Sequence, residues 1–298
     1  MEPAILTEGL SKSYGDTVAL DGLGLRVERG EIFGFLGPNG AGKSTTIRLL
    51  LDLIRPTAGR ALVLGMDCQR QSVAVRACTG YLPGDLRLYP ALRGREMVDL
   101  MAGLRKAPVD RRFVLGLAEK LGLDLEKPAG SLSKGNRQKL GIVLALVGRP
   151  PMLLLDEPTS GLDPIVQHTV WGILREEAQR GTAVFFSSHV MSEVDQVCER
   201  VGILRAGRLI AVEPVAGLKA RQVRHVAVSF ADATPPPDAF NLPGVREIRR
   251  ERLVAEFEVA GEIDGLLKAL APFHVVDLRT QQPALDEILL GYYQEATR

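Results

Sequence analysis

The chain has 298 residues, of which 46% are hydrophobic and 24% charged, and its formal net charge is +1. This composition is typical of a soluble globular protein, and the length suggests one large domain or a large domain plus a small one. The near-neutral charge gives no reason to expect nucleic acid or an anionic membrane surface as a partner. No apolar run approaches the roughly 18–20 residues that span a bilayer.

The N-terminus and the cysteines argue against a secreted protein. The first residues, MEPAILTEGL, carry no basic-then-apolar signal peptide pattern. Cys68, Cys78 and Cys198 have no metal-type spacing and form no even set. We therefore expect reduced thiols in a cytosolic protein.

The first part of the chain predicts strands, then a glycine-rich loop and a helix. Residues 3–36 are rich in strand patterns, and Glu31–Leu36 is a short apolar strand that leads into the loop. Apolar residues at helical spacing then predict a helix over Lys43–Leu53. Arg60–Leu64 is expected to be another strand.

The middle of the chain predicts a helical insert within an α/β core. Amphipathic helical patterns such as Arg95–Arg105 and Arg111–Leu121 occur there without a strong strand signal, and we place the insert at approximately residues 87–145. Met152–Leu155 and Ala183–Ser187 then form continuous apolar runs, which are typical of strands buried on both faces of a parallel sheet. A helix over residues 164–179 separates these two runs.

The last part of the chain predicts a second, smaller domain. We place a large domain at residues 1–219 and a small α+β domain at residues 220–298. The small domain is expected to contain strands at Val223–Phe230, Val245–Arg249, Leu253–Val259 and His274–Arg279, with helices near Glu262–Leu270 and Ala284–Tyr293.

The loop after the Glu31–Leu36 strand carries a phosphate-binding motif. Gly37–Ser44, GPNGAGKS, matches G-x-x-x-x-G-K-[ST] in full, and it lies between a predicted strand and a predicted helix. Backbone N–H groups of such a loop curl around phosphate oxygens, and the helix N-terminus adds its dipole. Lys43 supplies a positive charge, and Ser44 supplies a hydroxyl for Mg²⁺. The residues expected at the nucleotide are Gly37, Asn39, Gly40, Gly42, Lys43, Ser44 and Thr45.

Two adjacent carboxylates end the apolar strand at Leu153–Glu157. Asp156 is in position to hold Mg²⁺ directly or through water, and Glu157 is in position to polarise an attacking water. A phosphate loop followed by this pair predicts nucleotide hydrolysis.

Five segments occur in an order that resembles the nucleotide-binding domain of ABC transporters, over roughly residues 3–215. The resemblance implies an α/β P-loop NTPase core with an N-terminal antiparallel β subdomain and an inserted helical subdomain. It also implies the binding and hydrolysis of ATP with Mg²⁺ by a homodimer that sandwiches the nucleotides. The segments are Gly37–Ser44, Leu132–Asn136, Leu153–Glu157, Ser160–Pro164 and Ser187–His189.

The resemblance also assigns roles to single residues outside the phosphate loop. Ser133 and Gly135 would contact the γ-phosphate that is bound on the partner subunit. Asp163 matches the loop that crosses the dimer interface, and His189 matches the γ-phosphate-sensing histidine. Tyr14 matches the aromatic residue that stacks on adenine.

Two positions depart from the family pattern. The family usually has a glutamine after the strand that ends at Leu82, where this chain has Gly84, so we expect Asp85 or a water molecule to replace it. In the turn at Leu132–Asn136, Lys134 replaces the first glycine and Asn136 replaces the glutamine. We expect the Lys134 side chain to point to solvent.

With its short C-terminal domain, the chain is most similar to ATPase subunits of drug and antibiotic exporters of the daunorubicin-resistance type. This resemblance implies an integral membrane permease as a separate partner chain, no nucleic acid, and a place at the cytoplasmic face of the cell membrane. The alternative is a soluble ABC-type ATPase that acts on ribosomes, DNA or another protein assembly. A signalling GTPase would need an Asn-Lys-x-Asp motif, and no asparagine of the chain is followed by lysine.

Overall fold

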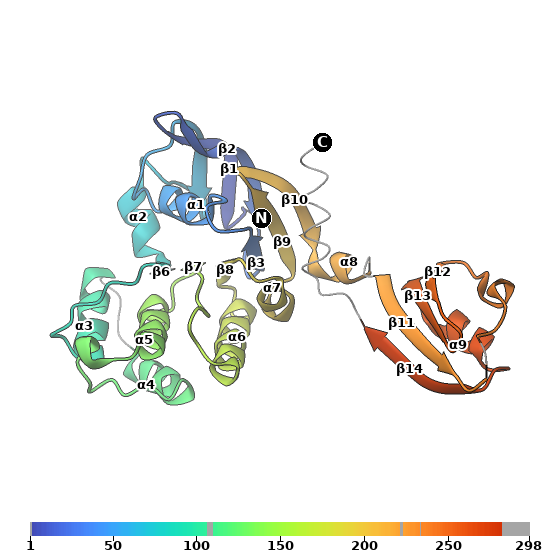
Figure 1. Cartoon of the computed structure of the whole chain (residues 1–298). Coiled ribbons are helices and arrows are strands. Elements are labelled where there is room, and N and C mark those ends of the chain that lie inside the picture. The colour runs from blue at the N-terminus through green and yellow to red at the C-terminus, as the bar shows by residue number, and fades with distance from the viewer. Residues whose placement is uncertain (1, 106–109, 221–222, 233, 282–298) are drawn as a thin grey trace. The chain divides into compact units, whose positions relative to one another are not determined.

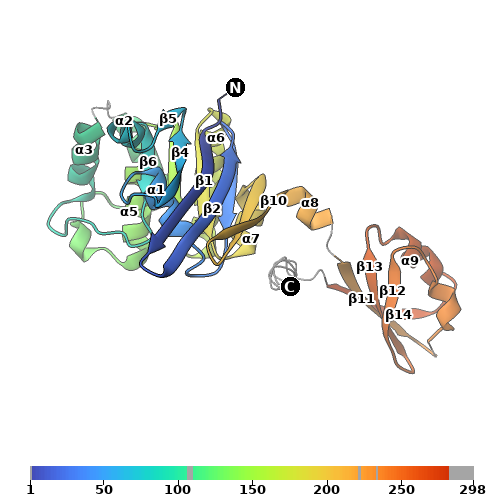
Figure 2. The same cartoon turned by 90° about the horizontal axis from the view of Figure 1, so that it is seen from above.

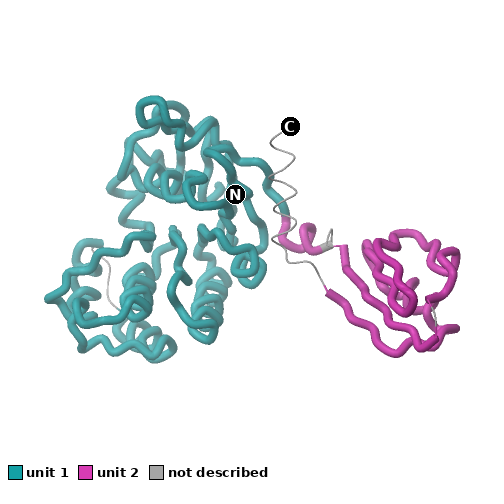
Figure 3. Tube along the Cα trace, viewed as in Figure 1, with its two compact units in different colours: residues 1–213 teal, residues 214–298 magenta. Residues whose placement is uncertain are grey.

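The computed structural model describes residues 2–105, 110–220, 223–232 and 234–281. The chain divides into two compact units, residues 1–213 and 214–298 (Figure 3). The division falls a few residues before residue 219, because the helix at Val215–Ala220 groups with the second unit.

The described part of the first unit contains two sheets, with helices between their strands along the chain. One sheet has six strands in the order β10-β9-β3-β8-β7-β6, and the other has four in the order β2-β1-β4-β5. Its elements are β1 Ile5–Tyr14, β2 Thr17–Val27, β3 Ile32–Leu36, α1 Lys43–Leu50, β4 Ala58–Val63, β5 Met66–Asp67, α2 Ser72–Ala77, β6 Thr79–Leu82, α3 Gly94–Arg105, α4 Arg111–Lys120, η1 Ala129–Ser131, α5 Lys134–Leu146, β7 Met152–Asp156, α6 Pro164–Gln179, β8 Ala183–Ser188, α7 Met191–Val197, β9 Arg200–Arg205 and β10 Arg208–Pro214.

The central strands are apolar throughout because both faces of the six-stranded sheet are covered. Every residue of β3, β7 and β8 is buried, and these strands pair in parallel. On one face Ile47 and Leu50 of α1 join a core that also includes residues of the four-stranded sheet. On the other face α6 and α7 pack against β3 and β8. Figure 2 shows β1, β2 and β4 side by side in the antiparallel sheet.

The helical insert consists of α3, α4 and α5, which Figure 1 shows gathered on the side of β6. The side chain of Arg105, at the end of α3, donates to the carbonyl oxygens of Ala145 (3.2 Å) and Val147 (2.8 Å). These carbonyls lie at the C-terminus of α5, where the last turn has no intrahelical partners. Arg105 therefore ties α3 to the end of α5.

The second unit is a four-stranded antiparallel sheet with a short helix and a 3₁₀ turn on one face. The strand order is β12-β13-β11-β14, and Phe240 packs against Phe257 of β13 with ring centroids 4.8 Å apart. The predicted helix Ala284–Tyr293 lies outside the described residues. The elements are α8 Val215–Ala220, β11 Val223–Phe230, η2 Pro237–Phe240, β12 Val245–Arg250, β13 Val254–Ala260, α9 Asp264–Leu270 and β14 Val275–Gln281.

The helix after the phosphate loop is shorter than the sequence pattern predicted. It ends at Leu50, and Asp52 has a φ of 53°. The N–H of Leu53 donates to the Arg48 carbonyl (2.9 Å), which closes the helix with a left-handed residue in the C′ position. Periodicity could not reveal this ending, because apolar residues continue at helical spacing beyond it.

The cysteines are free thiols in the structure. Burial raises the pKa of Cys68 to about 12, and burial also raises the pKa of Cys198 well above its usual value. Both thiols therefore stay protonated at neutral pH, which makes them poor nucleophiles. In the described part of the chain, no helix is both long and apolar enough to cross a membrane.

We predict that Phe185→Ala destabilises the first unit strongly. Phe185 is fully buried and packs on Phe35, with ring centroids 4.9 Å apart, so its removal leaves a cavity that costs about 3–5 kcal/mol of unfolding free energy. Trp171 is the single tryptophan of the chain and lies buried in this unit, so urea unfolding followed by its fluorescence reports the change. The exposed Tyr89→Ala variant is the control and should stay within about 0.5 kcal/mol of the wild type. A Phe185→Ala midpoint equal to that of the control would contradict the packing described here.

Candidate nucleotide site

The phosphate loop runs from the end of β3 to the start of α1 and fits closely under neighbouring backbone. A Cβ at Gly37 would come within 2.4 Å of the Leu204 carbonyl oxygen. A Cβ at Gly42, whose φ is 112°, would come within 2.6 Å of the Ala19 carbonyl oxygen. Only glycine fits at these two positions. The loop borders a cavity of about 150 Å³, which is lined by Ala19, Asn39, Gly40, Gly42, Lys43, Ser44, Thr45 and Glu157.

Lys43 is buried beneath the loop and lies near both acidic residues. Its Nζ donates to the carbonyl oxygens of Gly37 (2.6 Å) and Pro38 (3.2 Å) and lies 3.9 Å from Oε1 of Glu157. Burial lowers the pKa of Lys43, while Glu157 and Asp156 act to raise it. The ammonium has given up most of its hydration, so a phosphate anion in the cavity would compensate a charge that the protein satisfies only in part.

Asp156 is buried at the end of β7. One of its carboxylate oxygens accepts a hydrogen bond, and the other faces the backbone of Gly84. Asp156 pairs with Ser187 in the register of β7 and β8, and the Ser187 hydroxyl donates to Oδ1 of Asp156 (2.6 Å). A Cβ at Gly84 would lie 3.1 Å from Oδ2. The bare glycine leaves space beside this oxygen, and a carboxylate oxygen is a ligand that suits Mg²⁺, as is the hydroxyl of Ser44 in the lining of the cavity. When bound there, Mg²⁺ would neutralise phosphate charge.

Glu157 follows in a conformation that aims it at the cavity. Its φ is 50°, which is a left-handed value, and its N–H donates to Oγ of Ser187 (3.2 Å). Oε1 of Glu157 lies 3.1 Å from Nδ1 of His189. Lys43 and His189 thus both lie next to the same carboxylate oxygen of Glu157, and the sequence predicted all three residues at the site.

The sequence analysis missed the residues that hold the segment after β8. The Ser188 hydroxyl donates to Glu193 (2.5 Å), and the Thr159 hydroxyl donates to the other oxygen of Glu193 (2.7 Å). The N–H of Val190 donates back to Oγ of Ser188 (3.0 Å). These bonds fix both sides of His189. The bond from Thr159 to Glu193 joins residues 34 positions apart, so a local pattern in the sequence could not reveal it.

Ser133 and Gly135 lie at the start of α5 and do not line the cavity. The Ser133 hydroxyl oxygen accepts from the N–H of Asn136 (3.2 Å), so its own proton stays available to an anion. A Cβ at Gly135 would come within 3.2 Å of the Gly161 carbonyl oxygen. Lys134 is exposed, as expected.

Three predicted residues have contacts that do not involve the cavity. Asp163 caps α6 by accepting from the N–H of Val166 (3.0 Å). Tyr14 ends β1, is 48% exposed, and has the Lys12 ammonium 4.9 Å from its ring centroid. The carboxylate of Asp85 is exposed and lies 3.0 Å from Arg87. The replacement of the missing glutamine by Asp85 or a water molecule stays a prediction.

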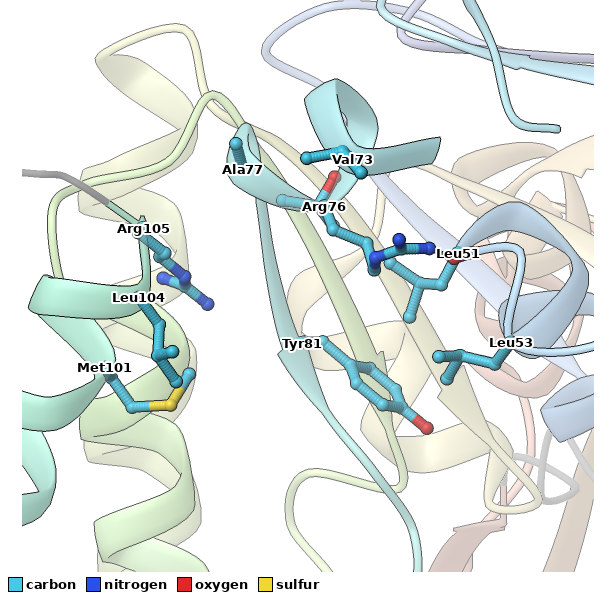
Figure 4. A pocket seen from close by; sticks show the side chains of 10 residues that line it. Leu51, Leu53, Val73, Arg76, Ala77, Tyr81, Met101, Leu104 and Arg105 are labelled. Carbon is cyan, nitrogen blue, oxygen red and sulfur yellow. Dashed lines mark hydrogen bonds between the residues drawn. The ribbon is translucent and has the colours of Figure 1, made fainter. Parts of the chain in front are cut away.

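A second pocket of about 400 Å³ lies between the insert and the core (Figure 4). Met101, Leu104 and Arg105 of α3 face Leu53 and Tyr81 across it. Leu51, Val73, Arg76, Ala77 and Thr79 complete the lining. The pocket is mainly apolar, and two guanidinium groups contribute to its walls.

A phosphate loop at the end of one strand and an acidic pair at the end of another define a P-loop nucleotide hydrolase. The family profile described as ABC transporter matches residues 20–160. The chain is 35% identical over 301 residues to a daunorubicin resistance ATP-binding protein of Streptomyces coeruleorubidus, covering 97% of this chain and 95% of that protein. It is 36% identical to the bacitracin transport ATP-binding protein of Bacillus licheniformis, covering 78% of this chain and 76% of that protein.

Among solved structures, an ATP-binding subunit of an ABC transporter matches with a TM-score of 0.69 and 29% identity, covering 72% of this chain and 92% of that chain. The chain belongs to the ABC transporter family. It is an ATP-binding and ATP-hydrolysing motor subunit of an exporter, and it binds ATP with Mg²⁺. Subunits of this family work as dimeric cassettes with membrane permeases. These relatives favour the exporter interpretation over an ATPase of ribosomes or DNA.

We predict that Lys43→Ala weakens ATP binding by about 10–100-fold, the range expected for loss of a charge-assisted hydrogen bond. Lys43 is the first residue of α1, directly after the loop, and its ammonium is buried. Titration with a fluorescent ATP analogue measures the effect. Lys120→Ala removes an exposed lysine on α4 that pairs with Glu176 and serves as the control. Equal affinities of the two variants for the ATP analogue would show that Lys43 does not contribute to phosphate binding.

Proposed function

We propose that Glu157 positions the water that attacks the γ-phosphate, while Lys43 and His189 neutralise charge that develops on the phosphate. The observation that carries this proposal is the meeting of Lys43 and His189 at one oxygen of Glu157, on the border of the phosphate-loop cavity. The carboxylate accepts a proton from the water as it attacks, and the cationic lysine stabilises the leaving charge.

We further propose that each cavity is completed by Ser133 and Gly135 of a second copy of the chain. In one chain these residues lie on α5 and do not line the cavity. A hydroxyl with a free proton at the N-terminus of a helix is a good anion site, so the turn has the chemistry to bind a phosphate held by another subunit. Loss of the γ-phosphate then removes the bridge, and the dimer opens. The second unit, residues 214–298, would assist dimerisation or regulation.

The second pocket is the proposed docking site for the membrane permease. Its apolar lining suits the apolar face of a short helix, and Arg76 and Arg105 suit an acidic side chain at the end of that helix. Strand β6 contributes Thr79 and Tyr81 to the pocket, and two residues after this strand Gly84 faces Oδ2 of Asp156. A displacement of β6 by the permease would therefore reach the metal-binding carboxylate. This docking would hold the chain at the cytoplasmic face of the cell membrane.

Glu157→Gln tests the hydrolysis mechanism. The amide still fits the site but cannot take a proton, so hydrolysis should fall at least about 100-fold, the contribution typical of a general base. ATP should still bind, and static light scattering should show a dimer in the presence of ATP. The exposed Glu176→Gln variant on α6 is the control and should hydrolyse ATP at the wild-type rate. Unchanged hydrolysis in Glu157→Gln, or no dimer with ATP, would contradict the proposed mechanism.

Leu104→Asp tests the docking site. Leu104 is 71% exposed and lines the pocket, so a carboxylate there should prevent an apolar helix from binding without harming the fold. Purification of the tagged chain from membranes in mild detergent should then lose the permease, while the ATPase rate of the purified chain stays within about twofold of the wild type. The matched control is Leu115→Asp on α4, which is 62% exposed and does not line this pocket. Retention of the permease by Leu104→Asp would place the docking site elsewhere.

A further inference from the structure

Gln138 on α5 joins the helix to the backbone of the catalytic carboxylate. Its Nε2 donates to the carbonyl oxygens of Glu157 (3.1 Å) and Pro158 (3.0 Å). Both acceptors are main-chain carbonyls, so the side chain of Gln138 binds them through the two donors of its N–H₂ group and not through its amide oxygen. No motif assigns a role to this residue.

The backbone at Glu157 needs such an anchor. A residue before proline normally adopts an extended conformation, but Glu157 has a φ of 50°. Left-handed backbone is also unfavourable for a residue with a side chain. Ser187 holds the N–H of Glu157, and the N–H of Ser160 donates to the Glu157 carbonyl (3.1 Å). Gln138 is a second donor to the Glu157 carbonyl and also donates to the Pro158 carbonyl. It therefore fixes the peptide that sets the direction of the Glu157 side chain.

The same helix begins with the turn that faces the partner's nucleotide in the proposed sandwich. Ser133 caps α5, and Gly135 packs against the Gly161 carbonyl in the loop that follows Glu157. Gln138 lies one turn further along this helix. A small movement of α5 would therefore also move the Glu157 backbone of the same chain, because the side-chain amide of Gln138 joins the two.

We propose that Gln138 is a positioning residue that sets the direction of the Glu157 carboxylate and makes hydrolysis at a chain's own site depend on α5, whose first turn contacts the nucleotide of the partner. This inference rests on the proposed function of Glu157 and of the Ser133–Gly135 turn. It gives the two nucleotide sites of a dimer a direct physical link within each chain.

The first test compares Gln138→Leu and Gln138→Glu with the wild type in the full-length chain. Both variants lose the N–H₂ group, and the second keeps the shape of the side chain. The hydrolysis rate should fall about tenfold or more because the carboxylate is misplaced, while the dissociation constant for ATP stays unchanged. Gln167→Leu is the matched control, because Gln167 donates to the Leu162 carbonyl (3.3 Å) in the same loop but not to Glu157 or Pro158. It should keep the wild-type rate.

Mixed dimers of two differently tagged full-length chains separate positioning from a structural role of α5. In each dimer one chain carries Glu157→Gln, so the single-turnover hydrolysis of bound ATP reports the other chain's site. Gln138→Leu in the competent chain should slow this turnover about tenfold. When Gln138→Leu is instead placed in the Glu157→Gln chain, the turnover should equal that of the mixed dimer in which Gln138 is unchanged in both chains.

A structural role predicts the opposite pattern, because damage to α5 would harm the turn that serves the nucleotide of the partner. The proposal would be overturned if the hydrolysis rate fell only in dimers that carry Gln138→Leu in the inactive chain. Equal hydrolysis rates in all mixed dimers would also overturn it. Failure of the proposed function is distinguishable, because Glu157→Gln homodimers would then hydrolyse ATP at the wild-type rate whatever Gln138 does.

Discussion

The parallel pairing of β3, β7 and β8 is the constraint on which the site depends. Because these strands run in the same direction, their carboxyl ends meet at one edge of the sheet. The phosphate loop follows β3, Asp156 ends β7 and is followed by Glu157, and His189 follows β8. Burial of both faces of the sheet keeps the register fixed, since a slip by one residue would exchange the side chains of the two faces and disrupt their packing. Side chains more than a hundred positions apart, those of Lys43 and Glu157, thus come within ion-pair distance (3.9 Å).

One pairing within that register has a particular consequence. Asp156 lies opposite Ser187, whose hydroxyl binds both the Asp156 carboxylate and the N–H of Glu157. A single hydroxyl therefore orders both the carboxylate of Asp156 and the backbone of Glu157. The left-handed conformation at Glu157 is held on its N-terminal side by this serine and on its C-terminal side by Gln138. Strain of this kind persists only where neighbouring groups fix it, and it is often found at catalytic positions.

Helix α5 connects the regions of the first unit that have to communicate. Its first turn carries Ser133 and Gly135, its next turn carries Gln138, and its C-terminal carbonyls accept from Arg105, which lines the second pocket. A helix of 13 residues is stiff enough to carry a displacement from one end to the other. In the proposed dimer, one rigid helix would therefore contact the partner's nucleotide, the backbone of the chain's own Glu157 and the wall of the proposed permease pocket.

The sequence by itself determined the local chemistry: the phosphate loop at Gly37–Ser44, the acidic pair at Asp156 and Glu157, and the apolar runs of the buried strands. These depend on neighbouring residues, so a pattern can reveal them. Only the tertiary structure decided that Ser187, Glu193 and Gln138 support the site. Those contacts join residues that are distant in the chain, and strand register and helix packing bring them together through interactions that no local pattern records.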